Sequence, residues 1–290
     1  MSKGTGPSRS ADERYQAGVS LASRRRFADA VAAYSEAVRL NPAFADAHYN
    51  LGVAYGELGR TRAAIKSYKK ATALNPEDWK AFVNLGIEYV NSRQYSKAID
   101  AFRRTTELKP DEVGAFASLG FNCGRMRRYT EAIEAYANAM KLKPDFAAGH
   151  YNTGLFHLHL GHFDQAVIAA QKALELDPEC GEACVVIGMA RMKSGDDDGA
   201  VSAFNQAVEL RPTLMEAHGN LAGMYLKLGR VDAAVREFRW ALELDSDDAE
   251  LHYEAGWAYW KRGDRKSACE EWGKALYAFL RHGMRAHRQQ

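Results

Sequence analysis

Six of the seven prolines in this chain recur at a fixed interval of 34 residues: Pro42, Pro76, Pro110, Pro144, Pro178 and Pro212. A period of this length is typical of stacked-repeat proteins, in which each repeat is one small helical or strand-containing element that buries its apolar face only against its neighbours. The spacing therefore predicts a row of repeats. It also directs the search for function to the surface that the repeats share.

Counting in both directions from the prolines gives eight repeats of 34 residues: 11–44, 45–78, 79–112, 113–146, 147–180, 181–214, 215–248 and 249–282. Repeat position 8 is glycine in all of them except one, where Ala222 stands, and position 20 is alanine in all eight. Position 24 is aromatic in every repeat except the fifth, which has Ala170. Small and large residues are thus placed in register, as packing between repeated elements requires.

Each repeat is predicted to be a pair of helices. In the second repeat, apolar and small residues recur with helical spacing over 45–58 and again over 62–74. Gly59 between these segments, matched by Gly161, Gly195, Gly229 and Gly263, is expected to end the first helix in a left-handed conformation. The second helix is expected to end at the leucine two residues before the proline, because the residue before proline disfavours helical geometry.

This pattern resembles the tetratricopeptide repeat (TPR) family over about nine tenths of the chain. The second repeat carries the resemblance most fully, through Leu51, Gly52, Tyr55, Ala64, Tyr68, Ala71 and Pro76. The resemblance implies an all-α fold, a right-handed superhelical solenoid of helix-turn-helix repeats. It also implies a non-catalytic protein-protein interaction scaffold, in which the first helix of each repeat lines a concave groove. Departures include His48, His150, His218 and His252 at an often aromatic position, and Leu280 in place of the last proline.

The composition excludes several classes of partner. The 39 lysines and arginines nearly balance the 37 aspartates and glutamates, so a net charge of +2 gives no electrostatic basis for binding nucleic acid or an anionic membrane. No apolar run is long enough for membrane insertion, and residues 1–10 lack the apolar core of a signal peptide. We therefore expect a cytoplasmic protein with a protein or peptide partner.

The two ends of the chain differ from the interior. Ser10 and Glu13 are expected to form a capping box for the first helix, which leaves residues 1–10 as a disordered N-terminal tail. The last repeat is rich in aromatic residues and is followed by Arg281, Arg285 and Arg288, so residues 283–290 form either a basic tail or the end of a capping helix. Because aromatic and arginine clusters often anchor interfaces, this end is also a candidate surface for forming a homo-oligomer.

A metal-dependent activity is the alternative from a different class. His157, His159 and His162, near Asp164, are the best metal-ligating candidates in the sequence. However, His157 and His159 are two residues apart and so point to different sides of a helix, while His162 lies in the following turn. The sequence contains no phosphate-binding glycine loop that follows a strand. We therefore expect no catalytic residue, no metal and no cofactor.

The groove positions known from the family suggest a peptide-binding site. Position 6 is asparagine in four repeats, as Asn50, Asn84, Asn152 and Asn220. An asparagine amide offers both a donor and an acceptor, so these side chains could hold the backbone of an extended peptide. They could equally be asparagines at solvated helix positions without a role in binding.

Other groove positions in the later repeats are apolar or basic. Positions 5, 9 and 12 supply Tyr151, Leu155, Leu158, Val185, Met189, Met192, Leu226, Tyr253, Trp257 and Trp260, some of which could instead pack between helices. Position 13 changes from Glu57 in the second repeat to Lys193, Lys227 and Lys261 in the last three. An apolar floor with a basic rim is expected to suit a segment that carries hydrophobic anchors and acidic residues.

One binding mode of the family does not fit this chain. Its chaperone-binding members hold a terminal carboxylate with lysine, asparagine and arginine side chains from three successive repeats. Around Asn50 only Asn50 itself and Lys80 match that set, while Tyr15, Val19 and Asn84 do not. We therefore predict a scaffold that binds a different peptide or partner segment in its groove, with self-association through the end and outer faces as the first alternative.

Overall fold

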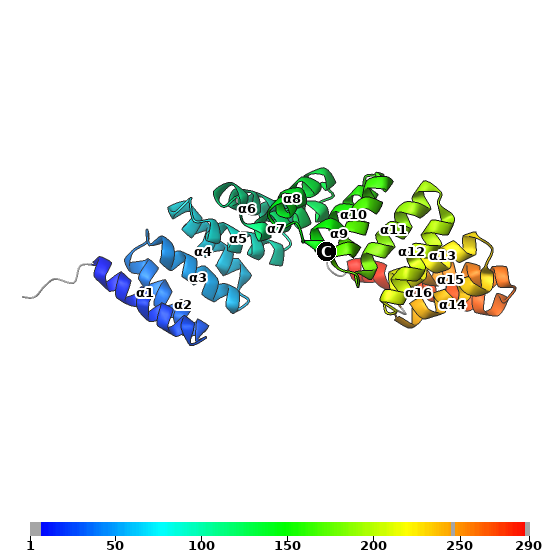
Figure 1. Ribbon diagram of the computed structural model, residues 1–290. Helices are drawn as coiled ribbons and strands as arrows, with labels where there is room; N and C mark the ends of the chain where they lie inside the picture. The colour runs from blue at the N-terminus through cyan, green and yellow to red at the C-terminus, as the bar shows by residue number, and fades with distance from the viewer. Residues whose placement is uncertain (1–6, 245–246, 288–290) are drawn as a thin grey trace, which may run out of the picture. The chain divides into compact units, whose positions relative to one another are not determined.

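The computed structural model describes the backbone of residues 7–244 and 247–287 and the side chains of residues 10–244 and 247–281. The described residues form sixteen helices joined by short turns, and they contain no strand (Figure 1). This confirms the predicted all-α repeat solenoid. The chain divides into two compact parts, residues 1–144 and 145–290, which we call the N-terminal half and the C-terminal half.

In each half, four helix pairs follow one another along the chain (Figure 1). The helices of the N-terminal half are α1 (Pro7–Ser23), α2 (Phe27–Leu40), α3 (Ala45–Glu57), α4 (Thr61–Leu74), α5 (Trp79–Asn91), α6 (Tyr95–Leu108), α7 (Val113–Arg125) and α8 (Tyr129–Leu142). Those of the C-terminal half are α9 (Ala147–His159), α10 (Phe163–Leu176), α11 (Gly181–Ser194), α12 (Asp197–Leu210), α13 (Met215–Lys227), α14 (Val231–Leu244), α15 (Ala249–Arg262) and α16 (Arg265–His287).

The second helix of each of the first seven repeats ends at the predicted leucine, from Leu40 in α2 to Leu244 in α14. In the first six repeats the next residue leaves helical geometry; Asn41, for example, has φ −133° and ψ 91°, and Asn75 has φ −129° and ψ 89°. This is the backbone region that a following proline favours in its predecessor. The 34-residue proline spacing therefore explains where these six repeats end.

The turn inside each helix pair requires a left-handed residue. Gly59, Gly161, Gly195, Gly229 and Gly263 have φ between 66° and 88°, which confirms their predicted role. The first, third and fourth repeats place Arg25, Arg93 and Arg127 at the same position with φ of 57° to 59°. A side chain with a Cβ atom is strained in this region, so these three turns are less favourable than the glycine turns.

The predicted start of the first helix was wrong. Helix α1 begins at Pro7, so Ser10 lies within the helix and does not act as its N-cap. Proline is well suited to the first helical position, where its missing N–H would have no intrahelical acceptor. Residues 1–6 of the predicted tail, Ser246 and Arg288 lie outside the described residues. At the other end, α16 continues to His287, as the capping-helix interpretation of residues 283–290 expects.

The register of small and large residues sets the distance between the paired helices. At Gly188 in α11, an added Cβ atom would lie 2.5 Å from Cε1 of Phe204 in α12, whose side chain is fully buried. Gly52 meets the ring of Tyr68 in the same way, at 2.7 Å. The aromatic ring at position 24 therefore occupies the space that a side chain at position 8 would need.

The first helices of neighbouring repeats also contact each other. In the C-terminal half α9 contacts α11, α11 contacts α13, and α13 contacts α15; in the N-terminal half α1 contacts α3 and α3 contacts α5. These first helices therefore lie next to one another along a shared face of each half. The candidate functional site lies on this face of the C-terminal half.

Candidate functional site

Two adjoining pockets lie between the first helices α11, α13 and α15. The larger, about 610 Å³, is called here the methionine pocket and is lined by Met189, Met192, Met215, Glu216, Gly219, Asn220, Gly223, Met224, Lys227, Asp248, Glu250, Leu251 and Glu254. The smaller, about 430 Å³, is called the aromatic pocket and is lined by Gly223, Leu226, Lys227, Phe238, Tyr253, Glu254, Trp257 and Lys261. Three residues belong to both linings, so the two pockets form one continuous groove.

Two glycines of α13 account for the depth of the methionine pocket. Gly219 and Gly223 occupy repeat positions 5 and 9, where the preceding repeat has Val185 and Met189 and the following one has Tyr253 and Trp257. An added Cβ atom at Gly223 would meet no heavy atom within 4 Å, and one at Gly219 would meet only Leu251 at 3.3 Å. The groove is therefore open at this repeat because α13 has no side chains there.

Carboxylates line the side of the methionine pocket formed by the starts of α13 and α15. Asp248 caps α15, since its Oδ1 accepts hydrogen bonds from the backbone N–H groups of Glu250 at 2.9 Å and Leu251 at 3.0 Å. Desolvation by the pocket walls raises the pKa of Glu254, and the neighbouring Glu250 and Asp248 raise it further. The pKa of Glu216 is raised in the same way, by desolvation and then by Glu182. These groups carry their negative charge at a cost that a cation would relieve.

The three lysines at position 13, which were predicted to form a basic rim, differ in their surroundings. Lys227 lines both pockets, but its Nζ is 2.6 Å from Oδ1 of Asp197, which already balances its charge. Lys261 lines the aromatic pocket, whereas Lys193 is exposed and lines neither. The prediction of a groove suited to acidic ligands considered position 13 alone. The methionine pocket is lined by four carboxylates, Glu216, Asp248, Glu250 and Glu254, and by a single lysine, Lys227.

The structure brings six of the twelve predicted site residues together in the two pockets: Met189, Met192, Asn220, Lys227, Trp257 and Lys261. Tyr151 and Leu155 instead pack against a core cluster around Ala166 and Ala170. Val185 and Leu158, also expected in the groove, are buried. The interpretation that some of these apolar residues pack between helices is therefore correct.

The residues that shape the pocket are not among the predicted site residues. Gly219 and Gly223 contribute open space, and a pattern of side chains that could contact a ligand gives no signal for such positions. Glu216 and Glu250 both stand at repeat position 2. The recurrence of glutamate at one position was the signal that could have identified the acidic side.

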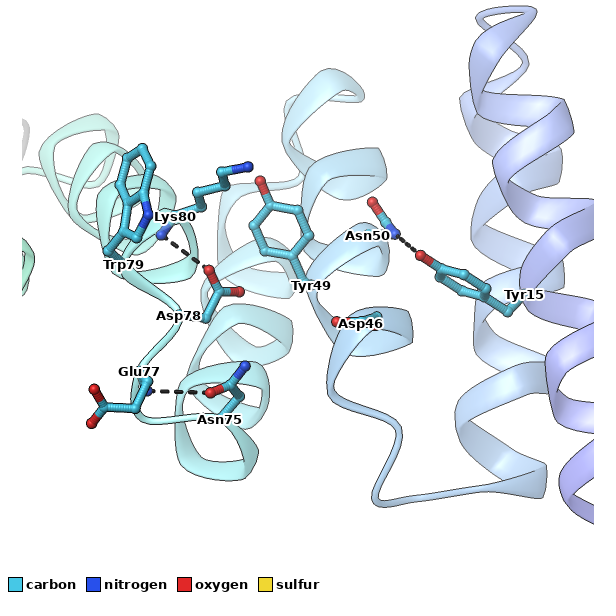
Figure 2. A pocket seen from close by; sticks show the side chains of 9 residues that line it. All are labelled: Tyr15, Asp46, Tyr49, Asn50, Asn75, Glu77, Asp78, Trp79 and Lys80. Atoms are coloured by element: carbon cyan, nitrogen blue, oxygen red, sulfur yellow. Dashed lines mark hydrogen bonds between the residues drawn. The ribbon is translucent and has the colours of Figure 1, made fainter. Parts of the chain in front are cut away.

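A third pocket, of about 440 Å³, lies between α1, α3 and α5 in the N-terminal half (Figure 2). Figure 2 shows the Tyr49 ring standing between Asn50 and the Asp78–Lys80 segment that opens α5. Several of its polar groups serve the local backbone: Asn75 Oδ1 accepts a hydrogen bond from the Glu77 N–H at 3.2 Å, and Asp78 Oδ1 accepts one from the Lys80 N–H at 3.1 Å. Asn75 and Asp78 therefore act first as local caps of the backbone in this pocket.

The histidine cluster is not arranged as a metal site. The rings of His157 and His162 have centroids 5.7 Å apart, and burial lowers the pKa of His157. Within the part of the chain that the structure describes, no group of three or more histidine, cysteine, aspartate or glutamate side chains is placed to hold a metal ion. Nor does any described helix have the length and apolar character needed to cross a bilayer.

Sequence patterns of the tetratricopeptide repeat match this chain from residue 18 to residue 263, leaving out only 79 and 113–123. The separate matches cover 18–59 and 222–263 (TPR repeat), and 45–78, 80–112, 124–179, 160–215 and 185–237 (tetratricopeptide repeat). The chain belongs to the tetratricopeptide repeat family. No curated protein sequence matches the chain.

Several solved structures resemble this architecture, and two of the following are described as TPR or tetratricopeptide repeat proteins. The MamA protein is 25% identical over 58% of this chain and 92% of its own, with a TM-score of 0.56. YrrB, described as a TPR protein with an unusual peptide-binding site, is 20% identical over 63% of this chain and 95% of its own, with a TM-score of 0.57. A tetratricopeptide repeat protein from Parabacteroides merdae is 16% identical over 81% of this chain and 93% of its own, with a TM-score of 0.66. The last two likenesses establish the fold alone.

The position-6 asparagines of the TPR units make two kinds of contact. Asn50 donates from Nδ2 to the Tyr15 hydroxyl at 2.8 Å, and Asn84 donates to the Tyr49 hydroxyl at 3.0 Å, so each links its repeat to the preceding one (Figure 2 shows the first pair). Asn152 and Asn220 donate instead to the backbone carbonyl four residues earlier, at 2.7 and 2.8 Å. Every amide in the predicted ladder therefore already uses one donor within the protein.

Proposed function

We propose that this TPR protein is a non-catalytic scaffold that binds a peptide or a segment of a partner protein in the groove formed by the methionine and aromatic pockets. The proposal is narrower than the sequence-based one, because it assigns binding to the first helices α11, α13 and α15. It rests on the family, whose members are interaction modules, and on the pockets described above. A cytoplasmic location stays a prediction.

The observation that carries the proposal is the open space above Gly223. Groups that line this space include the partly exposed Met189, Met192 and Met215, whose unbranched side chains can repack around different apolar ligands. Tyr253 and Trp257 continue the apolar surface into the aromatic pocket, where they are 53% and 42% exposed. A half-exposed aromatic pair next to a pocket of this volume is a favourable place for a partner side chain to bury apolar area.

The experiment is a blocking substitution at Gly223. Because an added Cβ atom there meets nothing within 4 Å, Gly223→Leu fills the pocket without forcing helices apart. The matched control is Gly273→Leu in α16, where an added Cβ atom is equally unopposed and which lines neither pocket. Both variants are compared with the unmodified protein on an array of synthetic twelve-residue peptides of mixed apolar and polar composition.

We expect the unmodified protein and Gly273→Leu to bind the same subset of peptides, and Gly223→Leu to bind that subset at least roughly tenfold more weakly, since the apolar anchor loses its site. Far-ultraviolet circular dichroism checks that all three proteins have equal helix content. If the unmodified protein binds no peptide, or if Gly223→Leu binds the same peptides equally well, the groove is not the binding site.

The asparagine ladder contributes to this proposal through Asn220 alone, because only this asparagine lines the methionine pocket. Its Nδ2 already donates to the Glu216 carbonyl, which leaves Oδ1 as an acceptor for a peptide N–H. Asn220→Ala should weaken peptide binding by about 1 kcal/mol. An unchanged affinity would show that the asparagines do not contribute to binding, and it would not affect the proposal that the pocket binds the peptide.

Self-association through the last helix is the second candidate function. Leu276, Phe279 and Leu280 of α16 are 60%, 70% and 52% exposed. The residues that match Leu276 in the three preceding repeats, Leu174, Val208 and Leu242, pack against core clusters of the C-terminal half. A second copy of the chain could cover the exposed residues of α16.

Light scattering coupled to size-exclusion chromatography tests self-association directly. A mass above the 32.2 kDa of one chain, reduced to that value by Leu276→Glu with Phe279→Glu, would support it. These two side chains are mostly exposed, so their replacement should not disturb the fold. A single-chain mass for the unmodified protein at all concentrations would overturn this second candidate without affecting the groove proposal.

A further inference from the structure

The chemistry of the groove narrows its ligand. We infer that the methionine pocket selects a partner segment in which a large apolar side chain stands next to a lysine or arginine. This inference rests on the proposed function, because it concerns the same groove. The lysines at position 13 alone suggest an acidic ligand, whereas this inference assigns the ligand a positive charge.

The apolar part of the ligand is specified by the space above Gly223. That space lies between Met189 and Met192 of α11 on one side and the start of α15 on the other. A pocket of about 610 Å³ exceeds the volume of a single leucine, methionine or phenylalanine side chain, so the remaining space admits a neighbouring residue of the ligand. The neighbour then meets the acidic side of the pocket.

The cationic part of the ligand is specified by carboxylates that lack partners. Glu216, Glu250 and Glu254 line the pocket, and among the described residues none of their side chains has a hydrogen-bond or ion-pair partner. By contrast, Glu182 at the same repeat position as Glu216 is paired with Arg211. Desolvation raises the pKa of Glu216 and Glu254, and neighbouring carboxylates raise both pKa values further.

No cation of the protein supplies that charge in the methionine pocket. Lys227 is the single lysine or arginine in its lining, and its Nζ is bound to Asp197. Lys261 belongs to the adjoining aromatic pocket. A ligand ammonium or guanidinium would therefore enter an environment of net negative charge. In the aromatic pocket, a guanidinium could also stack on the exposed face of Trp257.

An acidic ligand is disfavoured by the same groups. A carboxylate placed above Gly223 would face Glu216, Glu250 and Glu254 with no unpaired cation in the lining to offset them. Like charges at such a site oppose binding and so exclude acidic segments. Position 13 predicts an acidic ligand, whereas the carboxylates of the pocket predict a basic one. Measuring which charge the groove prefers therefore tests the inference.

The test uses a matched peptide array. Each nine-residue peptide of glycine and serine carries one central leucine, phenylalanine or methionine, and the residue beside it is lysine, glutamine or glutamate. We expect the lysine member of each set to bind roughly three- to tenfold more tightly than the glutamine member, and the glutamate member to bind most weakly. Added salt should reduce this preference, because it screens the partly exposed charges.

Charge variants of the protein assign the preference to the pocket. Glu216→Gln with Glu254→Gln should abolish the lysine preference while leaving the affinity for the glutamine peptides unchanged. The matched control, Glu209→Gln with Glu243→Gln, changes the net charge equally at exposed positions on α12 and α14 that line neither pocket. This control should keep the lysine preference.

The possible failures are distinguishable. Binding that Gly223→Leu blocks, but without a preference for lysine, overturns the charge inference and leaves the proposed function in place. A lysine preference that the control pair also loses assigns the effect to overall charge and likewise overturns the inference. The absence of any binding that depends on Gly223 overturns the proposed function itself, and the inference with it.

Discussion

Two glycine-to-leucine substitutions in neighbouring repeats should have opposite effects on stability. Gly188 in α11 and Gly223 in α13 are both helical, so leucine improves helix propensity at each by about 0.8 kcal/mol. Their surroundings differ. At Gly188 the added Cβ atom would lie 2.5 Å from Cε1 of Phe204. At Gly223 it would have no heavy atom within 4 Å, apart from its chain neighbours and the backbone of its own helix.

The magnitudes follow from packing. Phe204 is fully buried within the core cluster of α11, α12 and α13, so its ring cannot move aside without displacing neighbours. Overpacking of this kind costs about 1–3 kcal/mol for small insertions and more for a whole leucine. We expect Gly188→Leu to be destabilised by roughly 2 kcal/mol or more after its propensity gain, and Gly223→Leu to gain up to about 0.8 kcal/mol.

Urea unfolding followed by circular dichroism at 222 nm measures both effects, and hydrogen exchange locates them. Exchange is needed because repeats can open separately, so one transition midpoint does not describe the chain. Gly188→Ala serves as an intermediate control, since the seventh repeat accommodates Ala222 together with Phe238. Equal stabilities for the two leucine variants would refute the argument that the position-24 ring fills the space at position 8.

Three further predictions concern single residues. Arg93→Gly should stabilise the protein by about 0.5–1 kcal/mol in thermal or urea unfolding, because Arg93 has φ 59°, whereas Arg236→Gly in the middle of α14 should destabilise it by a similar amount. Glu254→Gln should stabilise it by less than about 1 kcal/mol at pH 7 and by nothing below pH 4. Because the pKa of Glu254 is raised from 4.5 in the folded state, the folded state keeps the Glu254 proton to a higher pH than the unfolded state does. Stability therefore falls as the pH rises from about 4.5 through the folded-state pKa. His218→Leu should lower the local unfolding free energy of α13 and α14, measured by hydrogen exchange, by roughly 1–3 kcal/mol, because the His218 side chain contacts Glu237 Oε2 at 2.7 Å and the carboxylate loses that partner. Unchanged exchange in these two helices would contradict this prediction.

The repeat boundaries could be predicted because single residues determine them. A proline forces its predecessor out of helical geometry wherever it stands, so the helix end at Leu74 follows from Pro76. The left-handed turn at Gly59 follows similarly from its residue type. The same turn at Arg93 could be found only through the repeat register, because arginine by itself gives no signal for positive φ.

The site was harder to predict because it depends on how several helices pack against one another. Met189 and Lys227, which their repeat positions assign to the groove, line the methionine pocket, whereas Val185 at another groove position is buried. Its burial depends on how closely α13 approaches α11, which no single position encodes. The acidic character of the pocket arises where α13 and α15 begin side by side, and only the assembled helices bring Glu216 and Glu254 to one pocket.

The first helix, α1, and the last, α16, differ in the apolar surface that they would offer to an additional repeat. In α3, Ala47, Leu51 and Ala54 are buried, and the matching residues of α1 are Glu13, Ala17 and Ser20, all exposed. A repeat engineered upstream of α1 would have to bury charged and small groups. One engineered after α16 would cover Leu276 and Phe279, each burial being worth about 1–2 kcal/mol. In an array designed from this chain, extension after α16 is therefore favoured over extension before α1.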